Sequence, residues 1–206
     1  MDILLTILAF LVAIMVHEIA HAYMADRLGD PTARIQGRLS LNPLVHLDWI
    51  GSVLVPGFLI LAGFPLVFGW AKPVMFDPYN LKRPRQDTAL ISLAGPVSNL
   101  LLAIGLAIVL QFFPLALFWL EPFVRINVIL ALFNLIPIHP LDGGKILIGL
   151  LPRETAWEWD QTLNKYGLFI LLLLIFPFAG RSILSLFLYP LINLVLGVLL
   201  PGGSLV

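Results

Sequence analysis

Long stretches without a charged residue constrain this chain more than any other feature of its sequence. Residues Ile3–Val16 and Thr88–Leu120 contain no Asp, Glu, Lys or Arg. A helix needs about 20 mostly apolar residues to cross a bilayer. Only 12% of the 206 residues are charged, whereas an ordinary soluble domain has roughly 25%. The sequence therefore predicts an α-helical polytopic membrane protein.

The order of apolar segments predicts how such a protein is built. Residues Ile3–Met24, Thr88–Leu120 and Ile126–Ile136 are expected to form a core of three helices, the second ending near a Phe-Phe-Pro break. Residues Tyr166–Phe178 and Ser182–Leu200 are expected to follow as a C-terminal helical hairpin.

The segment Ile50–Trp70 is also apolar, but several glycines and prolines interrupt it, which favours broken helices or a re-entrant loop. Short β-strands are expected just before it, around "ARIQGRLSL" at residues 33–41.

Basic residues distinguish a re-entrant segment from a spanning one. If Ile50–Trp70 turns back, ten basic residues lie on one side of the membrane and two on the other; if it crosses, the division is seven to five. The positive-inside rule favours the re-entrant arrangement, with the N-terminus outside the cell membrane and the ten residues in the cytoplasm. The ten are Arg27, Arg34, Arg38, Lys72, Lys82, Arg83, Arg85, Lys145, Arg153 and Lys165, and the two are Arg125 and Arg181.

The sequence "HEIAH" at residues 17–21 ends the first apolar run. His17 and His21 are about 40° apart around a helix, so they project from one face. In the H-E-x-x-H pattern two imidazoles bind zinc, and Glu18 would act as general base toward a water molecule whose pKa the metal lowers to about 7. A chance cluster or a solvated helix end is the alternative. Ionisable groups at bilayer depth cost about 2.5–3.5 kcal/mol each, which favours the metal site.

A third ligand is required, and without cysteine in the chain it must offer nitrogen or oxygen. Asp142 in "PLDGG" is the leading candidate, because it is the only acidic residue between Glu121 and Glu154. An ordinary turn aspartate before two glycines is the alternative. In the re-entrant arrangement His21 and Asp142 reach the same membrane depth, toward the cytoplasmic side.

Three motifs, taken in order, resemble the signatures of the site-2 protease family of intramembrane zinc metalloproteases. They are "HEIAH" at 17–21, "AGPVSN" at 94–99 and "NLIPIHPLDGGKIL" at 134–147. The stretches "LGDPTARIQGRLSLNPLVHLD" and "FGWAKPV" are similar to a short bacterial branch without a PDZ domain. The resemblance covers about residues 10–150 and implies a site-2-protease-like catalytic core at residues 1–150, followed by C-terminal membrane helices at 151–206.

The resemblance also implies the roles of individual residues. His17, His21 and Asp142 would hold one zinc ion per chain, and Glu18 would activate water to attack a peptide bond in a substrate's transmembrane segment. Asn99 and Asn134 would hold the substrate strand or stabilise the oxyanion, with hydrogen bonding between helices as the alternative. His46 matches the short branch and is a candidate for gating or for an alternative ligand, although it can instead be a loop histidine bonded to backbone. His139 departs from the proline expected beside the "LDG" turn, but it is close enough in sequence to Asp142 to be a second such candidate.

These observations predict a zinc metalloendopeptidase that acts within the lipid bilayer on single-span membrane proteins. Because twelve basic and twelve acidic residues cancel, no nucleic-acid partner is expected. A metal-binding membrane transporter that uses the same His and Asp residues is the alternative. Glu18 separates the two, because only a protease needs it for hydrolysis.

Overall fold

The computed structural model describes residues 3–42, 45, 48–55, 58, 61, 72–178 and 181–200 of the chain. This part is almost entirely helical. The longer helices are α1 (Ile3–Leu28), α4 (Pro84–Phe112), α5 (Leu117–Asn134), α6 (Asp142–Leu150), α7 (Arg153–Ile175) and α8 (Ile183–Leu199). Shorter elements are α2 (Thr32–Ile35), the π-helix η2 (Trp49–Leu54), and the 3₁₀ turns η3 (Pro78–Asn80) and η4 (Pro114–Ala116).

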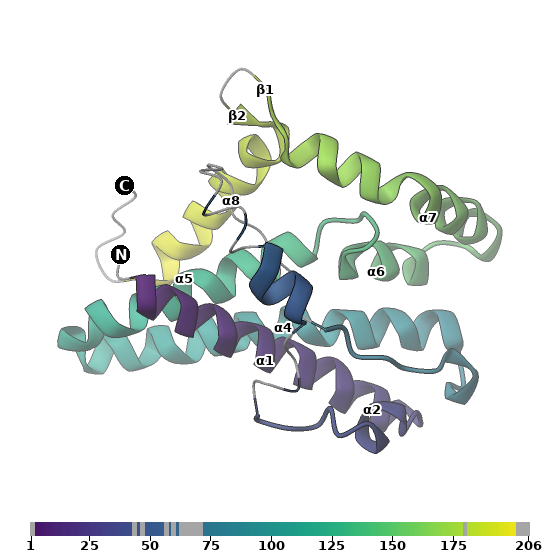
Figure 1. The fold of residues 1–206 in the computed structure, drawn as a ribbon, viewed down its shortest axis with the longest axis horizontal. Coiled ribbons are helices and arrows are strands. Elements are labelled where there is room, and N and C mark those ends of the chain that lie inside the picture. Colours follow the sequence, from purple (N-terminus) through teal and green to yellow (C-terminus); the bar gives the residue numbers. More distant parts are fainter. Residues whose placement is uncertain are drawn as a thin grey trace.

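Within the described part of the chain, three helical segments are long and apolar enough to cross a membrane: Ile3–Leu28, Pro84–Phe112 and Pro114–Asn134. The first two segments are α1 and α4, and the third consists of η4 followed by α5. The helices α1, α4 and α5 run alongside one another (Figure 1). Their outer faces carry large exposed apolar side chains, as lipid-facing helices require. The prediction of a helical membrane protein is confirmed.

The predicted break between the second and third helices is confirmed, because α4 ends at Phe112. The third helix, however, begins at Leu117 instead of Ile126. Its first turns contain Glu121 and Arg125, whose side chains form an ion pair of 2.6 Å one helical turn apart. Pairing on the same helix lowers the energetic penalty of both charges, so the helix extends through them.

Small residues bring α1 and α4 close together. The buried face of α1 repeats every fourth residue, and the face of α4 that meets it has the same repeat. This spacing lets the ridges of one helix pack between those of the other, and small side chains let the backbones approach. The face of α1 includes Ala9, Ala13, His17, His21 and Ala25, and that of α4 includes Ile91, Gly95, Asn99, Ala103 and Ala107.

The C-terminal helices pack on this core. α8 packs on α4 and α5 through Ile192 and Leu196, which join a buried cluster with Leu110, Val124 and Val128. Two antiparallel strands of two residues each, β1 (Pro177–Phe178) and β2 (Arg181–Ser182), lie between α7 and α8.

The expectation of short β-strands around residues 33–41 is wrong. Residues Thr32–Ile35 form α2, and the chain then turns at Gly37, whose φ is +68°. Asp30 explains the helix, because its carboxylate accepts hydrogen bonds from the amide and the hydroxyl of Thr32 at the start of α2. These local hydrogen bonds from side chain to backbone favour a helical turn at Thr32 over an extended strand. Most of the segment 50–70, expected to be re-entrant or broken, lies outside the described residues.

Asp30 also joins the two ends of the long connection between α1 and α4. It is fully buried, and besides Thr32 it accepts hydrogen bonds of 2.8 Å from the backbone amide of Asp77 and from Asn80 Nδ2. The C-terminal end of α1 therefore lies beside the start of α4. The two ends of the connection 29–83 therefore lie together at the same end of the helical core.

Asp30→Ala is expected to lower the free energy of unfolding by about 2–4 kcal/mol, because Thr32, Asp77 and Asn80 all lose the buried acceptor that they share. Thermal unfolding in detergent micelles measures this. Asp26→Ala is the matched control. Asp26 pairs with Arg34, a side chain that is 64% exposed, and such surface pairs contribute less than about 1 kcal/mol. Equal losses in the two variants would contradict the role of Asp30.

The same carboxylate predicts a pH dependence. Burial alone raises the pKa of Asp30, but hydrogen bonds from Thr32, Asn80 and Asp77 outweigh it and hold the pKa below its usual value. A lowered pKa stabilises the fold fully above the unfolded pKa of about 3.9, and this stabilisation is lost as the pH falls through the lower folded pKa. The melting temperature of the wild type should therefore fall more steeply below about pH 4 than that of Asp30→Asn.

Candidate active site

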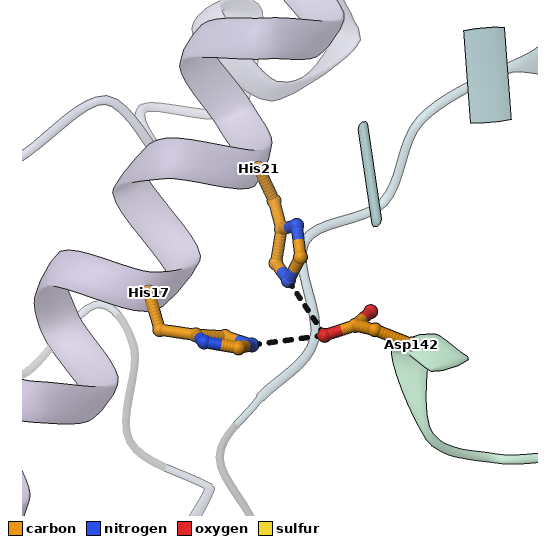
Figure 2. A group of neighbouring side chains, drawn as sticks. All are labelled: His17, His21 and Asp142. Atoms are coloured by element: carbon orange, nitrogen blue, oxygen red, sulfur yellow. Dashed lines mark hydrogen bonds and ion pairs between the residues drawn. The ribbon is translucent and has the colours of Figure 1, made fainter. Parts of the chain in front are cut away.

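Three side chains that could hold a metal ion converge where α1 meets the start of α6. His17 and His21 project from one face of α1 toward Asp142, in the first turn of α6 (Figure 2). Asp142 Oδ2 lies 3.0 Å from His17 Nε2 and 3.2 Å from His21 Nε2. The three residues are buried, and their ligand atoms all lie within 4.8 Å of one another. The structure thus brings together the three residues that the sequence nominates as metal ligands.

Hydrogen bonds on the far side of each imidazole fix its tautomer. His21 Nδ1 lies 2.7 Å from the backbone oxygen of Ile91, and His17 Nδ1 lies 2.6 Å from Asn99 Oδ1. Both partners are acceptor oxygens, so each Nδ1 carries the proton and each neutral ring presents a lone pair at Nε2. When the rings are neutral, the two Nε2 lone pairs therefore face the same carboxylate oxygen of Asp142. Such a donor set fits a zinc ion.

Gly95 of α4 forms the wall against which both imidazoles lie. A Cβ at this position would lie 2.5 Å from His21 Nε2 and 2.6 Å from His17 Cε1. The sequence offers one signal for this role, because a glycine inside a helix costs about 1 kcal/mol relative to alanine and so calls for a packing reason.

Gly143 places the third residue of the group. A Cβ there would lie 2.3 Å from the backbone oxygen of Ile136, just beyond the end of α5. The first turn of α6 therefore rests directly on the end of the third membrane helix, which sets the position of Asp142. A carboxylate at the start of a helix is also stabilised by the helix dipole.

Glu18 follows His17 on α1 and contacts a different part of the chain. Its Oε2 accepts a hydrogen bond of 3.0 Å from the backbone amide of Val74. Residues 72–77 run past α1 without regular secondary structure. The end of the "FGWAKPV" motif therefore lies beside Glu18, a contact that the sequence alone did not identify.

The two asparagines expected to contact substrate have different surroundings. Asn99 is fully buried, and its Nδ2 donates hydrogen bonds to the backbone oxygen of Ala13 at 2.9 Å and to Asn127 Oδ1 at 2.7 Å. Asn134 donates to the backbone oxygen of Leu130 on its own helix at 3.0 Å. Asn99 thus contacts His17, whereas the described contact of Asn134 is local.

The two histidines proposed as gating residues or alternative ligands differ in what can be said of them. His139 Nε2 lies 3.3 Å from Asp160 Oδ1, so the ring contacts α7. Among the described residues, the group able to hold a metal contains His17, His21 and Asp142 without His139. His46 lies outside the described residues.

Comparison with known proteins identifies the family. The sequence model of peptidase family M50 matches residues 5–118 and 116–175. The chain belongs to this family. These are the site-2 proteases that the three motifs resemble, so the chain is an intramembrane zinc metalloprotease. No solved structure matches the chain significantly.

Individual relatives agree with the family. YwhC of Bacillus subtilis is 37% identical over 199 residues, which cover 91% of this chain and 85% of YwhC. Rip2 of Mycolicibacterium smegmatis is 31% identical over 183 residues, covering 86% of this chain and 69% of Rip2. Both are named "putative zinc metalloprotease". Zinc metalloprotease MJ0392 of Methanocaldococcus jannaschii is 29% identical over 187 residues, covering 86% of this chain and 45% of that protein. The transporter alternative finds no support in these comparisons.

Gly95→Ala is expected to weaken zinc binding by about 10-fold or more, because the added methyl group displaces both imidazoles. Competition with a chromogenic chelator measures the affinity. Gly105→Ala is the matched control on the same helix, where a Cβ would meet no atom within 4 Å. If the two variants bound zinc equally well, the close contact at Gly95 would not limit the site.

Proposed function

We propose that His17, His21 and Asp142 hold the catalytic zinc ion of this protease and that Glu18 is the general base. One observation carries the assignment. Nδ1 of each imidazole faces an acceptor oxygen, of Asn99 or of a backbone carbonyl, so in neutral rings both Nε2 lone pairs face a carboxylate oxygen of Asp142. A buried group of this kind is stable only with a cation among its members.

The chemistry divides between the metal and the chain. When bound, zinc polarises the scissile carbonyl and makes water acidic enough to react at neutral pH. Glu18 takes the proton from this water and delivers it to the departing amine nitrogen. Its hydrogen bond from the Val74 amide orients the carboxylate for that task.

The substrates on this proposal are membrane proteins with a single transmembrane span. A helix shields its carbonyl groups, so the span must become extended before hydrolysis. Residues 72–77 run beside Glu18 and are proposed to guide the extended substrate by adding it as a strand. Asn134 is proposed to contact that strand or the oxyanion, whereas the contacts of Asn99 favour a role in orienting His17.

The proposed topology has the N-terminus outside the cell membrane and the site toward the cytoplasm. Two observations support it. The basic residues divide ten to two in this arrangement, and Asp30 holds both ends of the connection 29–83 at one end of the core. The segment 50–70 is then re-entrant, residues 1–150 form the catalytic core around three helices, and α7 and α8 form the C-terminal hairpin.

Glu18→Gln should leave zinc content at about one ion per chain and lower cleavage by at least about 100-fold, because the amide cannot take a proton. Purified protein is tested for metal content and for cleavage of a panel of single-span membrane proteins. Glu121→Gln makes the same chemical change in α5, where Glu121 pairs with Arg125, and should keep both properties. Wild-type cleavage by Glu18→Gln would exclude Glu18 as the base. Full zinc content in His17→Ala would exclude the ligand set.

A further inference from the structure

A second buried asparagine, Asn127 of α5, is connected to the metal site through Asn99. Asn127 is fully buried. Its Nδ2 donates a hydrogen bond of 2.8 Å to the backbone oxygen of Phe123, and its Oδ1 accepts one of 2.7 Å from Asn99 Nδ2. Asn99 Oδ1 in turn lies 2.6 Å from His17 Nδ1. A continuous chain of hydrogen bonds therefore runs from α5 through α4 to an imidazole of α1.

The polarity of this chain is set by two backbone carbonyls. A carbonyl oxygen accepts but cannot donate, so Phe123 requires the amide nitrogen of Asn127 and turns Oδ1 of Asn127 toward Asn99. The carbonyl of Ala13 likewise requires Asn99 Nδ2. Both hydrogens of that nitrogen are then used, one for Ala13 and one for Asn127. The remaining atom, Asn99 Oδ1, faces His17 and can only accept.

We infer that Asn127 is a positioning residue for the metal site, acting through Asn99 to keep the proton of His17 on Nδ1 and the lone pair on Nε2. The inference rests on the proposed role of His17 as a zinc ligand. Without Asn127, one hydrogen of Asn99 Nδ2 loses its acceptor and the amide is held only by Ala13. The Asn99 side chain is then less strictly oriented, and His17 can take the wrong tautomer.

The two imidazoles differ in their dependence on side chains. His21 Nδ1 bonds directly to a backbone oxygen of α4, which no side-chain substitution removes. His17 depends on an amide that could also be turned over, so a second amide is needed to hold it. Simple attachment of α5 to α4 would not require this order of donors and acceptors.

The first test is zinc affinity, measured on the full chain by chelator competition. Asn99→Ala should weaken binding about 10–100-fold, and Asn127→Ala roughly fivefold. Asn127→Leu, which fills a similar volume without polar atoms, should have the same effect and serves if the alanine variant does not fold. In the Asn99→Ala background, Asn127→Ala should weaken binding no further. Independent, additive losses would overturn the inference.

Asn134→Ala is the matched control. Asn134 lies two turns further along α5 and also donates to the carbonyl four residues earlier, so its loss removes the same local contact without touching Asn99. Its zinc affinity should remain that of the wild type. An equal loss of affinity in Asn134→Ala and Asn127→Ala would show a general effect of α5 and overturn the inference.

The tautomer itself provides a readout that general destabilisation does not move. The chain has four histidines, and nitrogen-15 NMR of histidine-labelled apoprotein distinguishes Nδ1–H from Nε2–H, with His17→Ala supplying the assignment. Nδ1 of His17 should be protonated in the wild type and only partly protonated in Asn127→Ala. Full protonation of Nδ1 in both proteins would overturn the inference. If His17→Ala kept full zinc affinity, the ligand set itself would fail, a result distinct from failure of the role of Asn127.

Discussion

The site depends on one constraint, that a polar group buried among membrane helices must find its partner within the protein. His17 and His21 meet it on one side of each ring, through Asn99 and the carbonyl of Ile91. The opposite nitrogens are left to Asp142 and a metal. The same requirement that stabilises the helices against one another thus prepares the two lone pairs, because committing each Nδ1 proton determines what Nε2 can do.

Close helix packing makes this possible. Asn99 can reach both the backbone of Ala13 and the ring of His17 only because α1 and α4 approach through small residues. Gly95 lets both imidazoles approach α4 closely, and Gly143 lets α6 start directly on the end of α5. The glycines therefore act on the site indirectly, through the distances between the backbones that carry the proposed metal ligands.

The sequence predicts the parts of this molecule that local patterns encode. Charge-free runs indicate the membrane helices, and the spacing of His17 and His21 indicates a shared face. The start of α5 was predicted too late in the sequence, at Ile126, after the charged residues Glu121 and Arg125. The helix accommodates these two residues because they form an ion pair. The strand expectation at residues 33–41 failed because it did not include the hydrogen bonds that Thr32 donates to Asp30 at the start of α2. Asn127 and Val74 act through partners distant in sequence, and no local pattern indicates such contacts.

Two carboxylates, one on α1 and one just after it, hold the segment 72–77 in place. Both accept hydrogen bonds from backbone amides of that segment. Glu18 accepts from the amide of Val74, and Asp30 accepts from that of Asp77. Residues 72–77 are therefore held at two points, one on α1 at the proposed base and one just past the end of that helix. Backbone hydrogen bonds fix the path of a segment without fixing its side chains. The region beside Glu18 can consequently keep its backbone path while the side chains of residues 72–77 vary.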